Sequence, residues 1–155
     1  MVRRFWVPNR RVLIGAMMAL VVVMSPGPGT ASEARLEPGR YRVEVRLELP
    51  HLSAADATKH VSICVDDAAD PAAVLRVLST NNPLGDCPVQ GRVITSNTVH
   101  FDVACQGLNA AKGSAEFQID QDRFQGRIAM KMGGKNMTMT EHQKGRRIGA
   151  CKPGE

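Results

Sequence analysis

Residues 41–49 alternate apolar and polar side chains without interruption. The apolar positions are Tyr41, Val43, Val45, Leu47 and Leu49. A period of two sustained in this way predicts a strand with one buried face. The same period recurs in residues 58–65, 89–95, 98–105, 113–119, 123–132 and 135–143, with polar or glycine-containing turns between most of these runs. We therefore expect seven strands.

One helix is expected, directly after the second strand. Asp70 is a favoured N-cap residue and Pro71 a favoured first helical residue. Together they predict a helix over residues 71–78, which the polar stretch 79–83 ends.

This order of elements predicts an all-β fold, mainly an antiparallel meander. A sheet with one apolar face must curl over itself or be covered by another layer. We expect a curled sheet or a partly open barrel, with the short helix plugging one end or covering part of the open face.

The first 34 residues have the pattern of a secretory signal peptide. Four arginines precede an apolar run over residues 12–24, and small residues, proline and glycine fill residues 25–34. The apolar run is shorter than the ~20 residues that span a bilayer. We expect cleavage after Ala31, or alternatively after Ala34, which leaves a single exported periplasmic domain over residues 32–155 with no membrane-spanning segment.

Cleavage changes the meaning of the formal charge of +5. Four of the 20 lysines and arginines lie in the predicted signal peptide, so the mature chain is almost neutral. Its aromatic residues, Tyr41, Phe101, Phe117 and Phe124, all fall at inward strand positions. Nucleic-acid binding normally requires a basic surface or exposed aromatic residues, so this class is not expected.

The four cysteines all lie in the mature region, and an even number in an exported chain predicts disulfides. We favour pairing Cys64 with Cys87 and Cys105 with Cys151, since the first bond would enclose the lone helix and the second would anchor the C-terminal tail. The rival pairing joins Cys87 to Cys105 across a hairpin and Cys64 to Cys151. The spacing does not match a zinc site.

Several segments resemble one bacterial exported family. They include "PGRYRVEVRLELP" (38–50), "VSICVDDAADP" (61–71), "SNTVHFDVAC" (96–105), "GSAEFQIDQDRFQGRIAMKMGGKNMTMT" (113–140) and "GRRIGAC" (145–151). The chain resembles the family catalogued as domain of unknown function 3617 over essentially its whole mature length. The resemblance implies a small periplasmic β protein and supplies no assigned activity, cofactor or functional residue.

The methionines of the mature chain all lie in one hairpin: Met130, Met132, Met137 and Met139. A two-residue turn at Gly133 and Gly134 would place Met130 opposite Met137 on the inward face. With Phe124 they are candidates to line a cavity for an apolar small molecule, or simply to fill the core. Thioethers also select Cu(I), which makes copper binding an alternative.

Basic residues occupy the other face of this hairpin and the tail. The candidates for contact with an anionic partner are Arg123, Arg127, Lys131, Lys135, Arg146 and Arg147, and Glu141 is the acidic residue among them. Such a patch could meet anionic lipid or an acidic partner, or could simply be a solvated sheet face.

No motif of a hydrolase, metalloprotease or phosphate-binding loop is present. We therefore expect a non-catalytic binding module for an apolar small molecule or an envelope component. The alternative is a structural or interaction module that uses its basic face.

Overall fold

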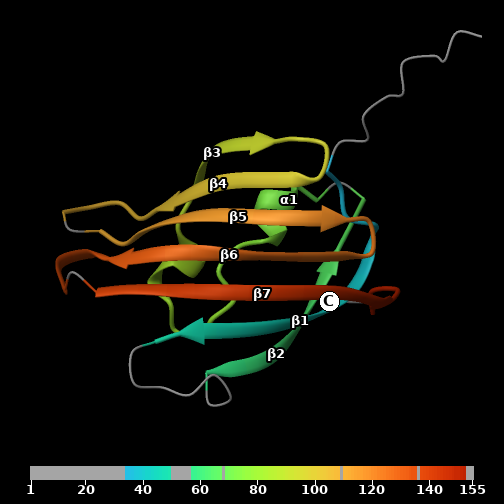
Figure 1. Ribbon diagram of the computed structural model, residues 1–155, viewed down its shortest axis with the longest axis horizontal. Coiled ribbons are helices and arrows are strands. Elements are labelled where there is room, and N and C mark those ends of the chain that lie inside the picture. The colour runs from blue at the N-terminus through green and yellow to red at the C-terminus, as the bar shows by residue number, and fades with distance from the viewer. Residues whose placement is uncertain (1–33, 50–56, 68, 109, 136, 153–155) are drawn as a thin grey trace, which may run out of the picture. The chain divides into compact units, whose positions relative to one another are not determined.

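The computed structural model describes residues 34–49, 57–67, 69–108, 110–135 and 137–152 (Figure 1). It contains the strands β1 (Gly39–Glu48), β2 (Thr58–Val65), β3 (Val89–Ile94), β4 (Thr98–Ala104), β5 (Lys112–Asp120), β6 (Arg123–Met132) and β7 (Met137–Gly149). The helical elements are α1 (Pro71–Val74) and the 3₁₀ turns η1 (Pro83–Asp86) and η2 (Gly133–Lys135). The predicted signal peptide, residues 1–31, lies outside the described residues.

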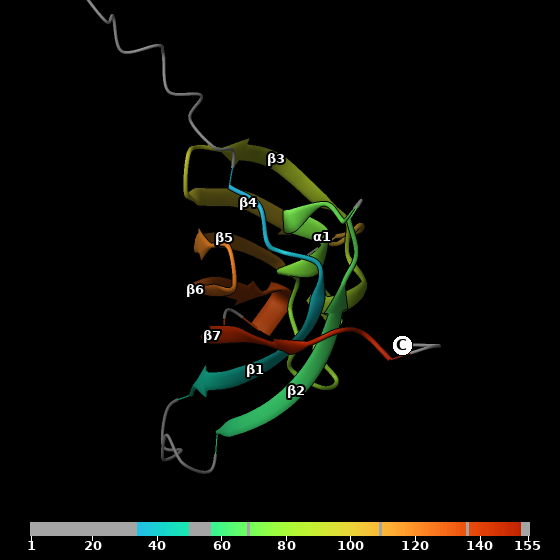
Figure 2. The same ribbon diagram turned by 90° about the vertical axis from the view of Figure 1, so that its right-hand side faces the viewer.

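The seven strands form one antiparallel sheet in the order β2-β1-β7-β6-β5-β4-β3. Strands β3 to β7 make the expected meander. β1 then adds beside β7, and β2 forms the edge opposite β3. The sheet stays open and curls around the segment that links its two edge strands (Figure 2). The predicted fold class is therefore confirmed.

The alternation in the sequence decides which face of the sheet is buried. Tyr41, Val43 and Val45 of β1 are fully buried, while Arg42 between them is exposed. Phe101 and Phe117 contribute to the same buried face from β4 and β5. We call this side the inner face and the polar side the outer face.

The connection between β2 and β3, residues 66–88, crosses the inner face and carries α1 (Figure 2). Leu75, Val77 and Leu84 of this connection are buried in the core. Ala34 and Leu36, which precede β1, are buried there as well. The inner face is thus covered by the chain itself, while no described element covers the outer face.

Two inner-face aromatic rings lie over glycines of the neighbouring strand. Phe124 is directly opposite Gly145, and Phe117 is directly opposite Gly126. A Cβ atom on Gly145 would come within 2.1 Å of the Phe124 ring, so only glycine fits below it. Phe124 also packs on Tyr41 and Phe117, with both ring centroids at 6.1 Å.

The helix is shorter than predicted, ending at Val74 rather than at residue 78. Its beginning is as expected, since the Asp70 side chain accepts a hydrogen bond from the Ala72 amide at 3.0 Å. A longer helix would need the Leu78 amide to donate to a backbone carbonyl. That amide donates instead to the Glu141 carboxylate at 2.8 Å, which removes it from the helical pattern.

The favoured disulfide pairing is wrong, and the rival pairing is correct: Cys64 bonds Cys151, and Cys87 bonds Cys105. The register explains both bonds. Val89 lies opposite Val103, so the residues two positions beyond them, Cys87 and Cys105, also meet, with Cα atoms 4.9 Å apart.

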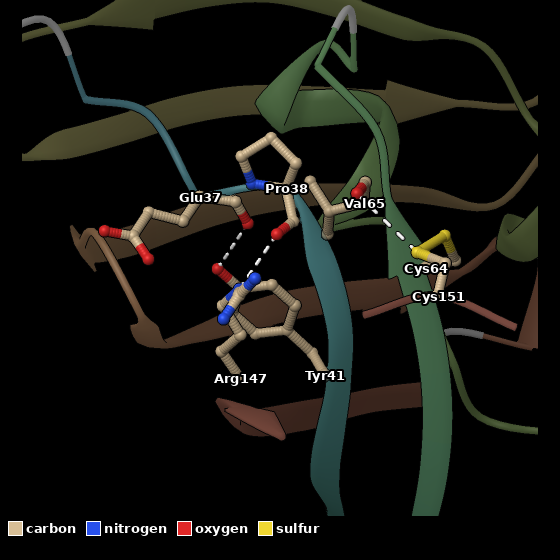
Figure 3. Close-up of a disulfide and its surroundings, with 7 residues drawn as sticks. All are labelled: Glu37, Pro38, Tyr41, Cys64, Val65, Arg147 and Cys151. Atoms are coloured by element: carbon tan, nitrogen blue, oxygen red, sulfur yellow. Dashed lines mark hydrogen bonds between the residues drawn. A yellow bond between two sulfur atoms is a disulfide. The ribbon is translucent and has the colours of Figure 1, made fainter. Parts of the chain in front are cut away.

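The bond between Cys64 and Cys151 follows from a strand order that alternation does not reveal. β2 and β7 flank β1, and Arg40 of β1 lies opposite both Cys64 and Gly149. Cys151, two residues beyond Gly149, reaches across β1 to Cys64, with Cα atoms 5.6 Å apart (Figure 3).

The predicted register of the methionine hairpin is also wrong. The turn includes η2, so Met130 lies opposite Met139, and Met132 lies opposite Met137. All four remain on one face because directly opposite residues of antiparallel strands point the same way. β7 also continues to Gly149, beyond the predicted end at residue 143.

Candidate functional site

Three arginines form a line across the outer face, one from each of three adjacent strands. Arg146 of β7 lies directly opposite Arg42 of β1 on one side and Arg123 of β6 on the other. All three are exposed. Because like charges directly opposite each other destabilise a sheet, this arrangement carries an unfavourable repulsion. We call Arg42, Arg146 and Arg123 the arginine row.

The charges of this surface are only partly neutralised by acidic neighbours. Arg123 pairs with Asp122 at 2.9 Å and with Asp120 at 3.5 Å. In contrast, Arg42, Arg146 and the adjacent Lys144 form no ion pair with any residue that the structure describes. The hydrogen bond from Arg123, assisted by the charges of Arg123 and Arg146, holds the pKa of the Asp122 carboxyl below its usual range.

Two shallow grooves cross this part of the outer face. One, of about 350 Å³, extends from Glu44 and Arg46 of β1 to Glu116 of β5. The other, of about 560 Å³, contains Arg123 and Arg146. Gln118, Gln125 and Lys144 line both grooves, so the two form one trough across four strands. Its exposed surface mixes polar and apolar atoms, and its lining includes Lys144 and Arg146, which form no ion pair with any described residue.

The structure brings together only some of the predicted basic candidates. Arg123, Arg127, Lys131 and Arg146 are exposed on the outer face, although Arg127 pairs with Glu116 at 3.5 Å. Arg147 lies elsewhere, opposite Tyr41, where its Nε donates to the Pro38 carbonyl at 2.8 Å. The side chain of Lys135 lies outside the described part of the chain.

The family described as protein of unknown function (DUF3617) matches residues 36–151. The chain belongs to the DUF3617 family. This match covers every strand of the sheet and both disulfides, and it confirms the resemblance found in the sequence. No curated protein and no solved structure matches the chain.

In this DUF3617 protein the predicted ligand-lining residues divide between the two ends of β6. Phe124 belongs to the aromatic cluster near the start of the strand, and Met130 lies six residues further on. At about 3.3 Å per residue this separation is roughly 20 Å. The methionines and Phe124 therefore do not line one small cavity together, and an apolar ligand stays a prediction.

A buried polar pair on the inner face was not anticipated. The Glu141 carboxylate accepts hydrogen bonds from the amides of Leu78 and Ser79, at 2.8 and 3.1 Å. Gln143 donates to the same carboxylate at 2.7 Å and to the Arg76 carbonyl at 2.8 Å. Glu141 is fully buried and so cannot offset the basic outer face. Its position two residues after Met139, on the inward side of the alternation, was the signal that could have revealed it.

A second buried group lies beside the Cys64–Cys151 disulfide (Figure 3). The Tyr41 hydroxyl is 2.8 Å from the carbonyl oxygen of Glu37 and 2.9 Å from that of Gln121. Burial raises the pKa of Tyr41 to about 12, because the charged phenolate would lose its hydration, although the nearby Arg147 opposes the shift. This cluster fixes the chain before β1 and has no exposed reactive group.

Among the described residues, no group of three or more histidine, cysteine or acidic side chains is placed to hold a metal ion. Within the same residues, no helix has the length and apolar character needed to cross a membrane. The candidate binding surface is the trough, whose lining includes Lys144 and Arg146, two cations that form no ion pair with any described residue.

Proposed function

We propose that this DUF3617 protein is an exported, non-catalytic module that docks through its outer face on the phosphate-bearing head groups of a lipid surface. The observation that carries the proposal is the arginine row with the neighbouring Lys144. Adjacent like charges cost stability in the free protein, and an anion placed between them would relieve that cost.

Two features of the protein and one general magnitude support a lipid surface as the partner. The trough extends over strands β1, β7, β6 and β5 and is shallow, which suits an array of head groups better than one enclosed molecule. Each lysine or arginine near an anionic membrane contributes about 1 kcal/mol of attraction. The two disulfides suit an oxidising compartment outside the cytoplasm, where envelope lipids are accessible.

Co-sedimentation with vesicles tests the proposal. The oxidised protein should bind vesicles that contain anionic phospholipid and not vesicles of zwitterionic phospholipid, and added salt should weaken the binding. The triple variant Arg42→Gln, Lys144→Gln, Arg146→Gln should lose roughly 100-fold in partitioning, given about 1 kcal/mol for each charge.

A matched control removes three positive charges away from the trough: Lys59→Gln, Arg76→Gln and Arg92→Gln. It should bind nearly as well as the unmodified protein. The proposal fails if the control loses as much binding as the Arg42, Lys144 and Arg146 variant. It also fails if the unmodified protein does not co-sediment with anionic vesicles. That result would make an acidic protein partner the better explanation of the basic surface.

A further inference from the structure

The four methionines of β6 and β7 form two directly opposed pairs at the end of the hairpin. Met130 faces Met139, and Met132 faces Met137. Directly opposite residues have Cβ atoms about 5 Å apart, and the two pairs follow each other at about 6.6 Å along the strands. Flexible side chains of this length can therefore bring several sulfur atoms to one point.

Exposure differs strongly across the four side chains. Met130 is buried, and its sulfur accepts a hydrogen bond from the Asn82 amide at 3.3 Å. Met132 and Met139 are half-buried, while Met137 is 43% exposed. The thioethers of Met132, Met137 and Met139 are thus accessible at the rim of the inner face, whereas that of Met130 is packed in the core. We call these three the rim methionines.

Core filling does not account for Met137, whereas Met132 and Met139 pack against the core and stay partly exposed. Along the rest of the inner face the sheet uses mainly valine, isoleucine, phenylalanine and tyrosine. A side chain that stays largely exposed gains little from burial, so Met137 contributes little to the core. A chemical property of the thioether is a better reason for its presence.

We propose that Met132, Met137 and Met139 bind one Cu(I) ion, while Met130 is packed in the core and is not part of the site. Neutral, soft thioether ligands select Cu(I) over harder cations. Competing soft ligands are absent from the described residues, because all four cysteines are in disulfides. The site is on the inner face and shares no residue with the outer-face trough. Copper binding can therefore be tested independently of lipid docking.

A competition titration tests this site. The oxidised protein is titrated with Cu(I) under anaerobic conditions against a chelator that reports free Cu(I). We expect one equivalent bound with a Kd below about 1 μM. Thioethers do not titrate, so the affinity should be unchanged between about pH 7 and pH 5, unlike that of a site built on histidine.

Leucine variants distinguish the three ligands from the packed Met130, because leucine and methionine exchange with little change in volume. Met132→Leu, Met137→Leu and Met139→Leu should each weaken binding by roughly 10- to 100-fold or more, since even residues behind metal ligands cost that much. Met130→Leu should bind Cu(I) as the unmodified protein does. Circular dichroism confirms that each variant is folded.

The proposal is overturned if the unmodified protein binds no tighter than micromolar, or if the variant lacking all three ligands binds equally well. It is also overturned if Met130→Leu loses affinity while the rim variants keep it, or if binding disappears as the pH falls. Any of these results would leave the methionines as packing residues.

Discussion

At the scale of single residues, the inner face depends on contacts that hydrophobicity alone does not specify. Phe117 and Phe124 lie over Gly126 and Gly145, and a Cβ on Gly126 would come within 2.3 Å of the Glu116 carbonyl oxygen. Because that contact is with backbone, a rotamer change cannot relieve it. These glycines are packing partners of the aromatic rings rather than flexible points of the strands.

Tyr41 gives a direct test of this packing, because it is the sole tyrosine of the sequence and its titration can be followed without overlap. We expect the phenol to ionise in the folded protein at about pH 12. Absorbance of the phenolate during a pH titration measures this value, and the same titration in denaturant should return to about 10.

The shift in the pKa of Tyr41 also predicts how stability changes with pH. The folded state holds the phenolic proton more tightly than the unfolded state, so the contribution to stability is fully present below about pH 10. It is lost as the pH rises toward the folded value of about 12. Urea unfolding across this range measures the loss. A folded-state titration near pH 10 would show that the hydroxyl is not buried as described.

At the scale of elements, the strands and the meander from β3 to β7 were predictable, but the pairing of β1 with β7 was not. Alternation identified β1 because apolar residues recur there at every second position. The structure agrees, since Tyr41, Val43 and Val45 are all fully buried. The pairing of β1 with β7 joins residues about 100 positions apart, and no local pattern records it. The Cys64–Cys151 bond depends on that pairing, so it could not be chosen from spacing.

The candidate surface was predictable only in part for the same reason. The outward positions of Arg123, Arg127 and Arg146 follow from alternation within each strand. The participation of Arg42 requires knowing that β1 lies beside β7. Arg147 leaves the outer face by the same alternation, because it directly follows the outward Arg146 and lies opposite the buried Tyr41.

Glu141 and Gln143 hold the crossover on the inner face from β7, and Glu141 provides a prediction at this scale. In Glu141→Gln an NH₂ group replaces an oxygen that accepts hydrogen bonds, so at least one buried donor loses its partner. We expect destabilisation of about 1–3 kcal/mol in urea unfolding. Amide hydrogen exchange at Leu78 and Ser79 should become faster than in the unmodified protein.

The matched control for this variant is Glu48→Gln. Glu48 is exposed and pairs with His142 at 3.1 Å, so its loss should cost less than about 1 kcal/mol. If the two variants had equal effects, the buried carboxylate would not be what holds the crossover in place.

At the scale of the whole sheet, the two disulfides secure its two edges. Cys64 belongs to the edge strand β2, and Cys87 directly precedes the hairpin that contains the other edge strand, β3. Edge strands have unpaired backbone groups on one side and are the parts of a sheet most prone to detach or to pair wrongly. Each bond therefore constrains the element that the sheet itself holds least well.

The two bonds should contribute unequally, because their separations along the chain are 87 and 18 residues. A disulfide that closes a longer loop restricts the unfolded chain more. Replacing Cys64 and Cys151 by alanine should cost about 4–5 kcal/mol, and replacing Cys87 and Cys105 about 3 kcal/mol. Chemical unfolding of the two double variants measures the difference, and hydrogen exchange should show β2 opening in the first and the β3–β4 hairpin in the second. If removing Cys87 and Cys105 lowered the free energy of unfolding more than removing Cys64 and Cys151, restriction of the unfolded chain would not explain the effect. The bonds would then stabilise the protein mainly by supporting the hairpin locally.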